Sequence, residues 1–137
     1  MRPVAALLGL LLGACAAPVP PADPGQARIS LRAAPADVLS AQRLDGQRLA
    51  DGRYVDVAPG THELQLRYQY DSRQGSGLFG EPRRVTCELR LRYAHFQAGR
   101  DYRFEARPLA LKAQGWLYDQ DGTEPLARAE VVRCGPF

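Results

Sequence analysis

Three cysteine thiols are the most reactive side chains of this 137-residue chain. Cys15 follows a short apolar stretch near the start, whereas Cys87 and Cys134 lie in later segments that alternate apolar and polar residues. A cysteine sulfur can carry a lipid, form a disulfide, bind a metal ion or act as a nucleophile. The sequence around each cysteine favours one of these uses.

Cys15 ends a segment with the features of an export signal. Arg2 gives it a positive start, and residues 4–12 are apolar. This stretch is shorter than the about 20 residues of a membrane-spanning helix. Leu12-Gly13-Ala14-Cys15 resembles the lipobox of bacterial lipoproteins. The resemblance implies diacylglycerol on the Cys15 sulfur, cleavage before Cys15 and acylation of the new amine.

A lipid on Cys15 would also define the location of the protein. Ala16 stands where an aspartate would signal retention in the inner membrane, so the resemblance implies the periplasmic face of the outer membrane. Four prolines between Ala16 and Gln26 predict a semi-rigid tether that reaches at most roughly 35 Å. We therefore predict a signal peptide at residues 1–14, a lipidated tether at 15–26 and one domain at 27–137.

Cys87 and Cys134 remain once Cys15 carries a lipid. An even pair in an oxidising compartment predicts a disulfide. This disulfide would close a loop of about 47 residues and stabilise the domain by about 4 kcal/mol in the chain-entropy model. A redox pair or a metal site is the alternative. However, the chain has no Cys-x-x-Cys motif, and its two histidines are far apart in the sequence. We favour the structural disulfide and expect no metal and no cofactor.

The remaining polar residues do not indicate catalysis. Acid-base chemistry at His62 or His95 would need a partner and a pocket, and we interpret both as structural histidines. There is no Gly-x-Ser-x-Gly motif, and the glycines of residues 75–80 lack the Lys-Ser/Thr ending of a phosphate loop. We therefore predict a protein that is not an enzyme.

The charged residues indicate a mixed surface. The formal charge is +3, and both signs are interspersed along the chain, which does not suggest a nucleic-acid partner. There are 17 arginines and one lysine. This excess has two interpretations: sites for phosphate or carboxylate groups, which a guanidinium binds in a two-pronged manner, or the codon usage of a GC-rich genome. We favour the second.

Two groups of apolar residues are candidate contact sites. The glycine-rich loop at 72–84 is longer than an ordinary hairpin loop and contains Leu78 and Phe79 among basic residues. We expect this pair to contact a partner protein or lipid headgroups, unless it folds onto the end of the sheet. Trp116 and Tyr118 share one face of a strand and could stack on the sugar rings of a glycan, although a buried tryptophan is commoner in a sandwich core.

Three functions remain open for such a protein. We favour an interaction or structural module at the membrane, with an envelope protein as its partner. The alternatives are a lipoprotein that binds peptidoglycan or polysaccharide, and an inhibitor of a cell-wall hydrolase.

The elements that position these residues are strands. From Ala27 onward, apolar residues recur with a period of two, and the pattern predicts an all-β fold, an antiparallel β-sandwich of roughly 7–8 strands. We expect no amphipathic helix, and one helical turn at most within residues 33–42. The clear strands are Thr61–Tyr70, Val85–Tyr93 and Tyr102–Arg107; the weaker ones are Ala27–Arg32, Val38–Leu44, Tyr54–Val57, Leu109–Tyr118 and Leu126–Arg133.

Turn residues separate these strands. Asp45-Gly46, Asp51-Gly52 and Asp121-Gly122 predict hairpins, and Pro59-Gly60 predicts a type II turn. Residues 44–64, which contain the first of these turns, an apolar strand and then Pro-Gly-Thr-His, resemble the PEGA-type β-module of bacterial envelope proteins. The resemblance implies a hairpin pair and no particular activity.

Overall fold

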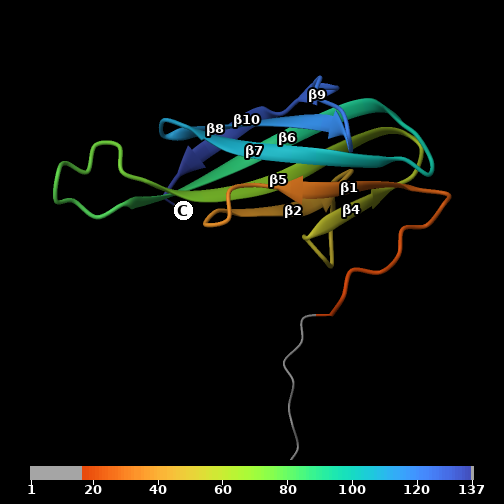
Figure 1. The fold of residues 1–137 in the computed structure, drawn as a ribbon, viewed down its shortest axis with the longest axis horizontal. Coiled ribbons are helices and arrows are strands. Elements are labelled where there is room, and N and C mark those ends of the chain that lie inside the picture. The colour runs from red at the N-terminus through yellow and green to blue at the C-terminus, as the bar shows by residue number, and fades with distance from the viewer. Residues whose placement is uncertain (1–16, 137) are drawn as a thin grey trace, which may run out of the picture.

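The computed structural model describes residues 17–136, so Cys15 and the predicted signal peptide lie outside the described residues. The described part forms ten strands and no helix, arranged in two stacked five-stranded sheets (Figure 1). The predicted all-β sandwich is therefore confirmed. The strand count is higher than expected because two of the ten strands have only two residues.

Within residues 17–136, no helix has the length and apolar character needed to cross a membrane.

The first sheet has the strand order β4-β1-β7-β8-β9. All its neighbouring strands are antiparallel except β1 and β7, which are parallel. The sandwich is therefore not antiparallel throughout, because the chain passes through the other sheet between β1 and β7. The strands are β1 (Ala27–Arg32), β4 (Tyr54–Val57), β7 (Asp101–Leu109), β8 (Lys112–Asp119) and β9 (Ala127–Arg128).

The second sheet has the order β10-β6-β5-β2-β3 and is antiparallel throughout. Its centre is the long hairpin of β5 and β6, which extends along most of the molecule (Figure 1). The strands are β2 (Val38–Leu44), β3 (Gln47–Arg48), β5 (Gly60–Ser72), β6 (Arg83–Phe96) and β10 (Glu130–Gly135).

The core lies between the two sheets, where the alternating apolar side chains of both meet. Two tyrosines of β5 are buried with their rings stacked at a centroid distance of 5.3 Å. The Tyr68 hydroxyl donates to a carboxylate oxygen of Asp37 at 2.5 Å. The Tyr70 hydroxyl lies between two acceptors, the carbonyl oxygen of Lys112 and that of Ala110, the latter at 3.0 Å. Buried hydroxyls are thus satisfied, as expected. The other large core residues include Ile29, Val55, Val57, Leu66, Leu89, Leu91, Tyr102, Phe104 and Leu117.

Two predicted strands are wrong because each is divided in the structure. The expected strand 109–118 is interrupted by a turn at Ala110-Leu111 that joins β7 to β8. Ala110 has a φ of 54°, and no glycine marks the turn. The expected strand 126–133 is divided at Ala129, where the chain leaves β9 and enters β10 of the other sheet.

The predicted turns are confirmed in part. Asp45-Gly46 joins β2 to β3 with φ values of 50° and 81°, as a tight hairpin requires. Asp51-Gly52 is not a hairpin: its chain crosses from β3 to β4 in the other sheet, and a side-chain oxygen of Asp51 accepts from the backbone N–H of Arg53 at 3.0 Å. Gly60 has the expected positive φ, 111°, but Pro59-Gly60 joins strands of different sheets.

Candidate functional site

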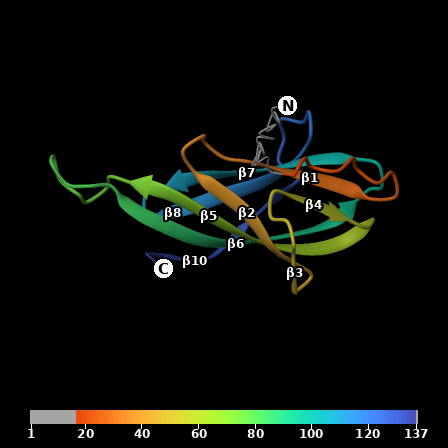
Figure 2. The same ribbon diagram turned by 90° about the horizontal axis from the view of Figure 1, so that it is seen from below.

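The loop between β5 and β6, residues 73–82, projects from one end of the sandwich in both views (Figures 1 and 2). A turn orders it: the backbone N–H of Ser76 donates to the carbonyl of Arg73 at 3.2 Å, and the Ser76 hydroxyl donates to the same oxygen at 2.6 Å. Gly80 lies against this turn, because a Cβ there would be 1.7 Å from the carbonyl oxygen of Ser76. The loop is therefore folded back on itself.

Leu78 and Phe79 lie in this loop and face solvent. Their exposed fractions are 88% and 95%. The pair therefore does not fold onto the end of the sheet, which was the alternative interpretation. Large apolar side chains that are exposed next to one another often mark a contact with a partner.

A second apolar feature lies at the base of the loop. The start of β6, the turn at Ala110-Leu111 and the end of β10 surround a hollow of about 200 Å³. Leu109 and Leu111 are also partly exposed here. We call the combination of residues 73–85, the turn 110–111 and residues 134–136 the loop end. The lining of the hollow is Arg83, Arg84, Val85, Leu111, Cys134, Gly135 and Pro136.

The predicted disulfide is present and fixes one side of this hollow. Cys87 and Cys134 are directly opposite each other in the register of β6 and β10, with an S–S distance of 2.08 Å. Cys87 is fully buried, and Cys134 is partly buried at the edge of the core. The bond therefore holds the end of the chain against the base of the loop.

Three arginines, Arg73, Arg83 and Arg84, outnumber the single carboxylate of Glu81 within residues 73–85. Arg84 forms an ion pair with Asp71 at 3.2 Å. For Arg73 and Arg83, no carboxylate oxygen of residues 17–136 lies within the 4.0 Å of an ion pair. The apolar pair is thus accompanied by arginines that are free to bind an acidic surface.

Trp116 and Tyr118 lie on the outer face of the first sheet, not in the core, and both are half-buried. An arginine covers each ring: the guanidinium carbon of Arg107 is 6.0 Å from the Trp116 ring, and that of Arg103 is 4.6 Å from the Tyr118 ring. Arg103 is held in place by Glu105 at 2.8 Å. A sugar that stacks on these rings would compete with cation-π contacts.

The two histidines lie apart from the loop end. His62 bonds to the Asp45 carboxylate at 2.6 Å and to the carbonyl of Ala58 at 2.7 Å, so it connects two turns. The backbone N–H of Glu63 and the ring of His62 both donate to Asp45 and lower its pKa. His95 is exposed, with its ring edge-on to Tyr93 at 5.8 Å. Within residues 17–136, no group of three or more His, Cys, Asp or Glu residues could hold a metal ion.

Sequence reasoning identified the apolar pair but missed the hollow beside it. The hollow depends on the turn at Ala110-Leu111, which no glycine or asparagine announces, and on the separation of β9 from β10. The sequence signal that could have indicated the hollow is the pair of leucines Leu109 and Leu111, both of which are exposed in the structure.

Comparison with known proteins does not add a relative. No protein-family model, no curated protein and no solved structure matches this chain. The lipobox and the PEGA-type resemblance therefore stay predictions, and a functional proposal has to come from the geometry of the loop end.

Proposed function

We propose that this protein is a non-enzymatic lipoprotein, anchored through Cys15 at the periplasmic face of the outer membrane, whose loop end docks on a partner protein. The exposure of Leu78 and Phe79 is the observation that carries the proposal. Burying such a pair in a partner removes most of its apolar surface from water, which contributes about 1.5–3 kcal/mol for each side chain.

The chemistry of the loop end specifies the partner. Phe79 fits a small apolar pocket, because a large side chain that inserts into a pocket often dominates the affinity of an interface. Arg73 and Arg83 favour acidic residues around that pocket, since complementary charges guide association. The partner is therefore a protein with an apolar pocket and an acidic rim.

The position of the tether supports this assignment. The tether joins β1 at the end of the sandwich opposite the projecting loop (Figure 1). It then runs beside β1 and β4, where Arg28 donates to the carbonyl of Pro20 at 2.5 Å and Arg53 donates to that of Ala17 at 2.7 Å. An anchor on this side leaves the loop end free, and the disulfide suits an oxidising compartment.

In vivo photocrosslinking tests the docking site. A photoreactive residue at position 76 is combined with wild-type Leu78-Phe79, with the double variant Leu78→Ser/Phe79→Ser, or with the control Leu126→Ser. Leu126 is also exposed but follows β8 at the other end of the sandwich. We expect one protein adduct that is absent with the double variant and present with the control. The protein identified in this adduct, once purified, should bind the wild-type chain directly. Adducts with lipid alone, or an adduct that the double variant keeps, would contradict the proposal.

Membrane fractionation tests the anchor separately. The wild-type chain is expected in the outer-membrane fraction, and Cys15→Ala in the soluble fraction, because two or three acyl chains hold a protein durably at a membrane. Retention of Cys15→Ala in the membrane pellet would exclude the lipid as the anchor, without bearing on the loop end.

A further inference from the structure

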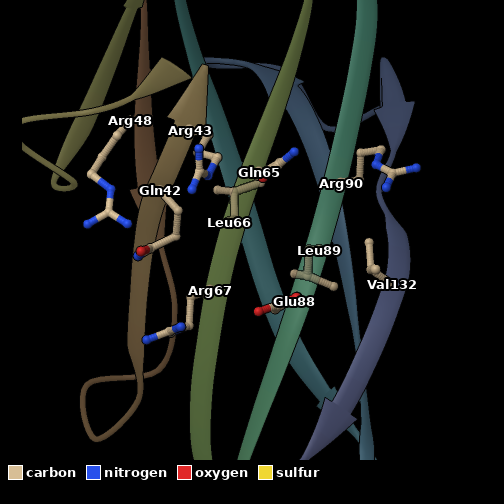
Figure 3. Close-up of a pocket in the computed structure, with 10 residues that line it drawn as sticks. All are labelled: Gln42, Arg43, Arg48, Gln65, Leu66, Arg67, Glu88, Leu89, Arg90 and Val132. Atoms are coloured by element: carbon tan, nitrogen blue, oxygen red, sulfur yellow. The ribbon is translucent and has the colours of Figure 1, made fainter. Parts of the chain in front are cut away.

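The outer face of the second sheet contains a hollow of about 280 Å³ that extends across β2, β5, β6 and β10 (Figure 3). It lies on a different surface from the loop end and uses none of the residues of that site. Its lining residues are Gln42, Arg43, Arg48, Gln65, Leu66, Arg67, Glu88, Leu89, Arg90 and Val132. We call this hollow the arginine groove.

Two β-bulges shape the groove. In β2, Ala41 pairs with Leu66 and Arg43 pairs with Gln65, so Gln42 is an extra residue without a partner across the strand. In β10, Val131 pairs with Leu89 and Arg133 pairs with Glu88, so Val132 is extra in the same way. A bulge bends its strand, increases the twist and redirects a side chain, and bulges are common beside binding sites. Here both extra residues line the groove, one on each side.

Three arginines of the groove form no ion pair with a carboxylate of residues 17–136. Arg43 and Arg48 stand directly opposite each other in the register of β2 and β3, where like charges repel. Arg67 lies on the neighbouring strand β5, opposite Glu88 in the register of β5 and β6. Figure 3 shows the side chains of Arg43, Arg48 and Arg67 around that of Gln42. Over residues 17–136, no carboxylate oxygen lies within 4.0 Å of any of these three guanidinium groups.

Glu88, the one carboxylate among the lining residues of the groove, is engaged by another arginine. Glu88 is bound by Arg133 through two contacts of 2.9 and 3.0 Å, and this pairing is the main cause that lowers the pKa of Glu88; the positive charge of Arg67 adds to it. Arg90 approaches Glu63 and Glu130 only to 3.8 Å, beyond hydrogen-bond distance. Its Nε is buried and has no hydrogen-bond partner in the described part of the chain. Buried donors without an acceptor are uncommon in native proteins.

We propose that the arginine groove binds an oxyanion of the phosphate class. A guanidinium offers two parallel N–H donors that match two oxygens of a phosphate, and several cations suit its multiple charges better than the single charge of a carboxylate. The amides of Gln42 and Gln65 are further donors in the lining. A phosphate of this kind has two sources, the headgroup of an anionic lipid and a soluble phosphorylated molecule.

Titration of the purified chain with three probes tests the proposal. The probes are inorganic pyrophosphate, phosphatidylcholine vesicles that contain phosphatidylglycerol, and the same vesicles without it. Arg43→Gln and Arg67→Gln are compared with Arg128→Gln, which removes the same charge from an exposed position on β9 of the other sheet. Thermal unfolding of each variant checks that it folds like the wild type.

We expect saturable binding that weakens about ten-fold or more in the two groove variants and stays within about two-fold in Arg128→Gln. If the groove variants bind pyrophosphate more weakly than wild type does, the ligand is a soluble phosphorylated molecule. If they weaken only in binding to the vesicles that contain phosphatidylglycerol, the ligand is a lipid headgroup. An equal loss in Arg128→Gln, or no saturable binding of pyrophosphate or of the anionic vesicles, would overturn the proposal. None of these outcomes depends on Leu78 or Phe79, so the docking function is tested independently.

Discussion

The ring of His62 lies between two acceptors, with Nδ1 2.6 Å from a carboxylate oxygen of Asp45 and Nε2 2.7 Å from the carbonyl oxygen of Ala58. A ring N–H of His62 can donate to either oxygen. The other Asp45 oxygen accepts from the backbone N–H of Glu63 at 2.8 Å. This small network fastens the β2–β3 hairpin to the start of β5.

Replacing Asp45 by asparagine should lower the free energy of unfolding by about 1 kcal/mol at pH 7, allowing for the partial exposure of the carboxyl group. The pKa of Asp45 is lower in the folded protein than in the unfolded chain. Its contribution is therefore complete above the unfolded pKa, about 3.9, and is lost as the pH falls through the folded pKa. Urea unfolding at pH 7 and at pH 3 measures this, with Glu124→Gln as an exposed control.

The free energies of unfolding of Asp45→Asn and wild type should differ less at pH 3 than at pH 7. An equal difference at both pH values would contradict this role of the carboxylate. The hairpin would then be held by the backbone alone.

The disulfide should contribute a large part of the stability. The bond joins residues 47 positions apart. The free energy of unfolding of the double variant Cys87→Ala/Cys134→Ala should therefore be about 4 kcal/mol lower than that of wild type. Urea unfolding under non-reducing conditions measures the loss, and wild type in reductant should show a similar one. Alkylation of both Cys87 and Cys134 in the native protein without prior reduction would rule out the bond.

Gly115 should not tolerate a methyl group. A Cβ at this position would lie 2.5 Å from Cζ of Phe104, whose ring is fully buried. Overpacking of this kind destabilises by about 1–3 kcal/mol, so Gly115→Ala should lower the thermal midpoint by several degrees. Gln114→Ala, on the outer face of the same strand, should change it little.

Replacing the Phe104 ring by the smaller leucine side chain tests whether Phe104 limits the space at Gly115. Gly115→Ala should destabilise less in the Phe104→Leu background than in the wild type, since the leucine leaves room for the methyl group. Equal effects in both backgrounds would mean that Phe104 does not limit the space at Gly115.

The strands and the disulfide could be predicted from sequence because each is encoded by local or pairwise chemistry. The two-residue alternation of β5 and β6 corresponds to their buried and exposed faces, and Cys87 and Cys134 fall into register. The turn at Ala110-Leu111 could not be predicted, because the hydroxyl of Tyr70, from the opposite sheet, donates to the Ala110 carbonyl inside it. Tertiary contact, not local propensity, places this turn.

The two surface sites differ in the same way. The exposed pair Leu78-Phe79 could be inferred from loop length and composition. The arginine groove could not, because the bulges at Gln42 and Val132 are set by the pairing of β2 and β10 with their neighbours and leave no mark in the alternating pattern. An excess of arginine was visible, but its gathering on one sheet face was not.

Thiol labelling of Phe79→Cys measures most directly whether the loop end is covered in the cell. The rate of maleimide labelling is compared for the purified chain, the chain in lipid vesicles and the chain in intact envelopes, with Gln47→Cys on the exposed β2–β3 hairpin as the control. Docking on a partner protein predicts fast labelling of position 79 in solution and in vesicles and at least about ten-fold slower labelling in envelopes, with no such change at position 47. Equal rates at position 79 in all three settings, or protection by vesicles alone, would contradict it.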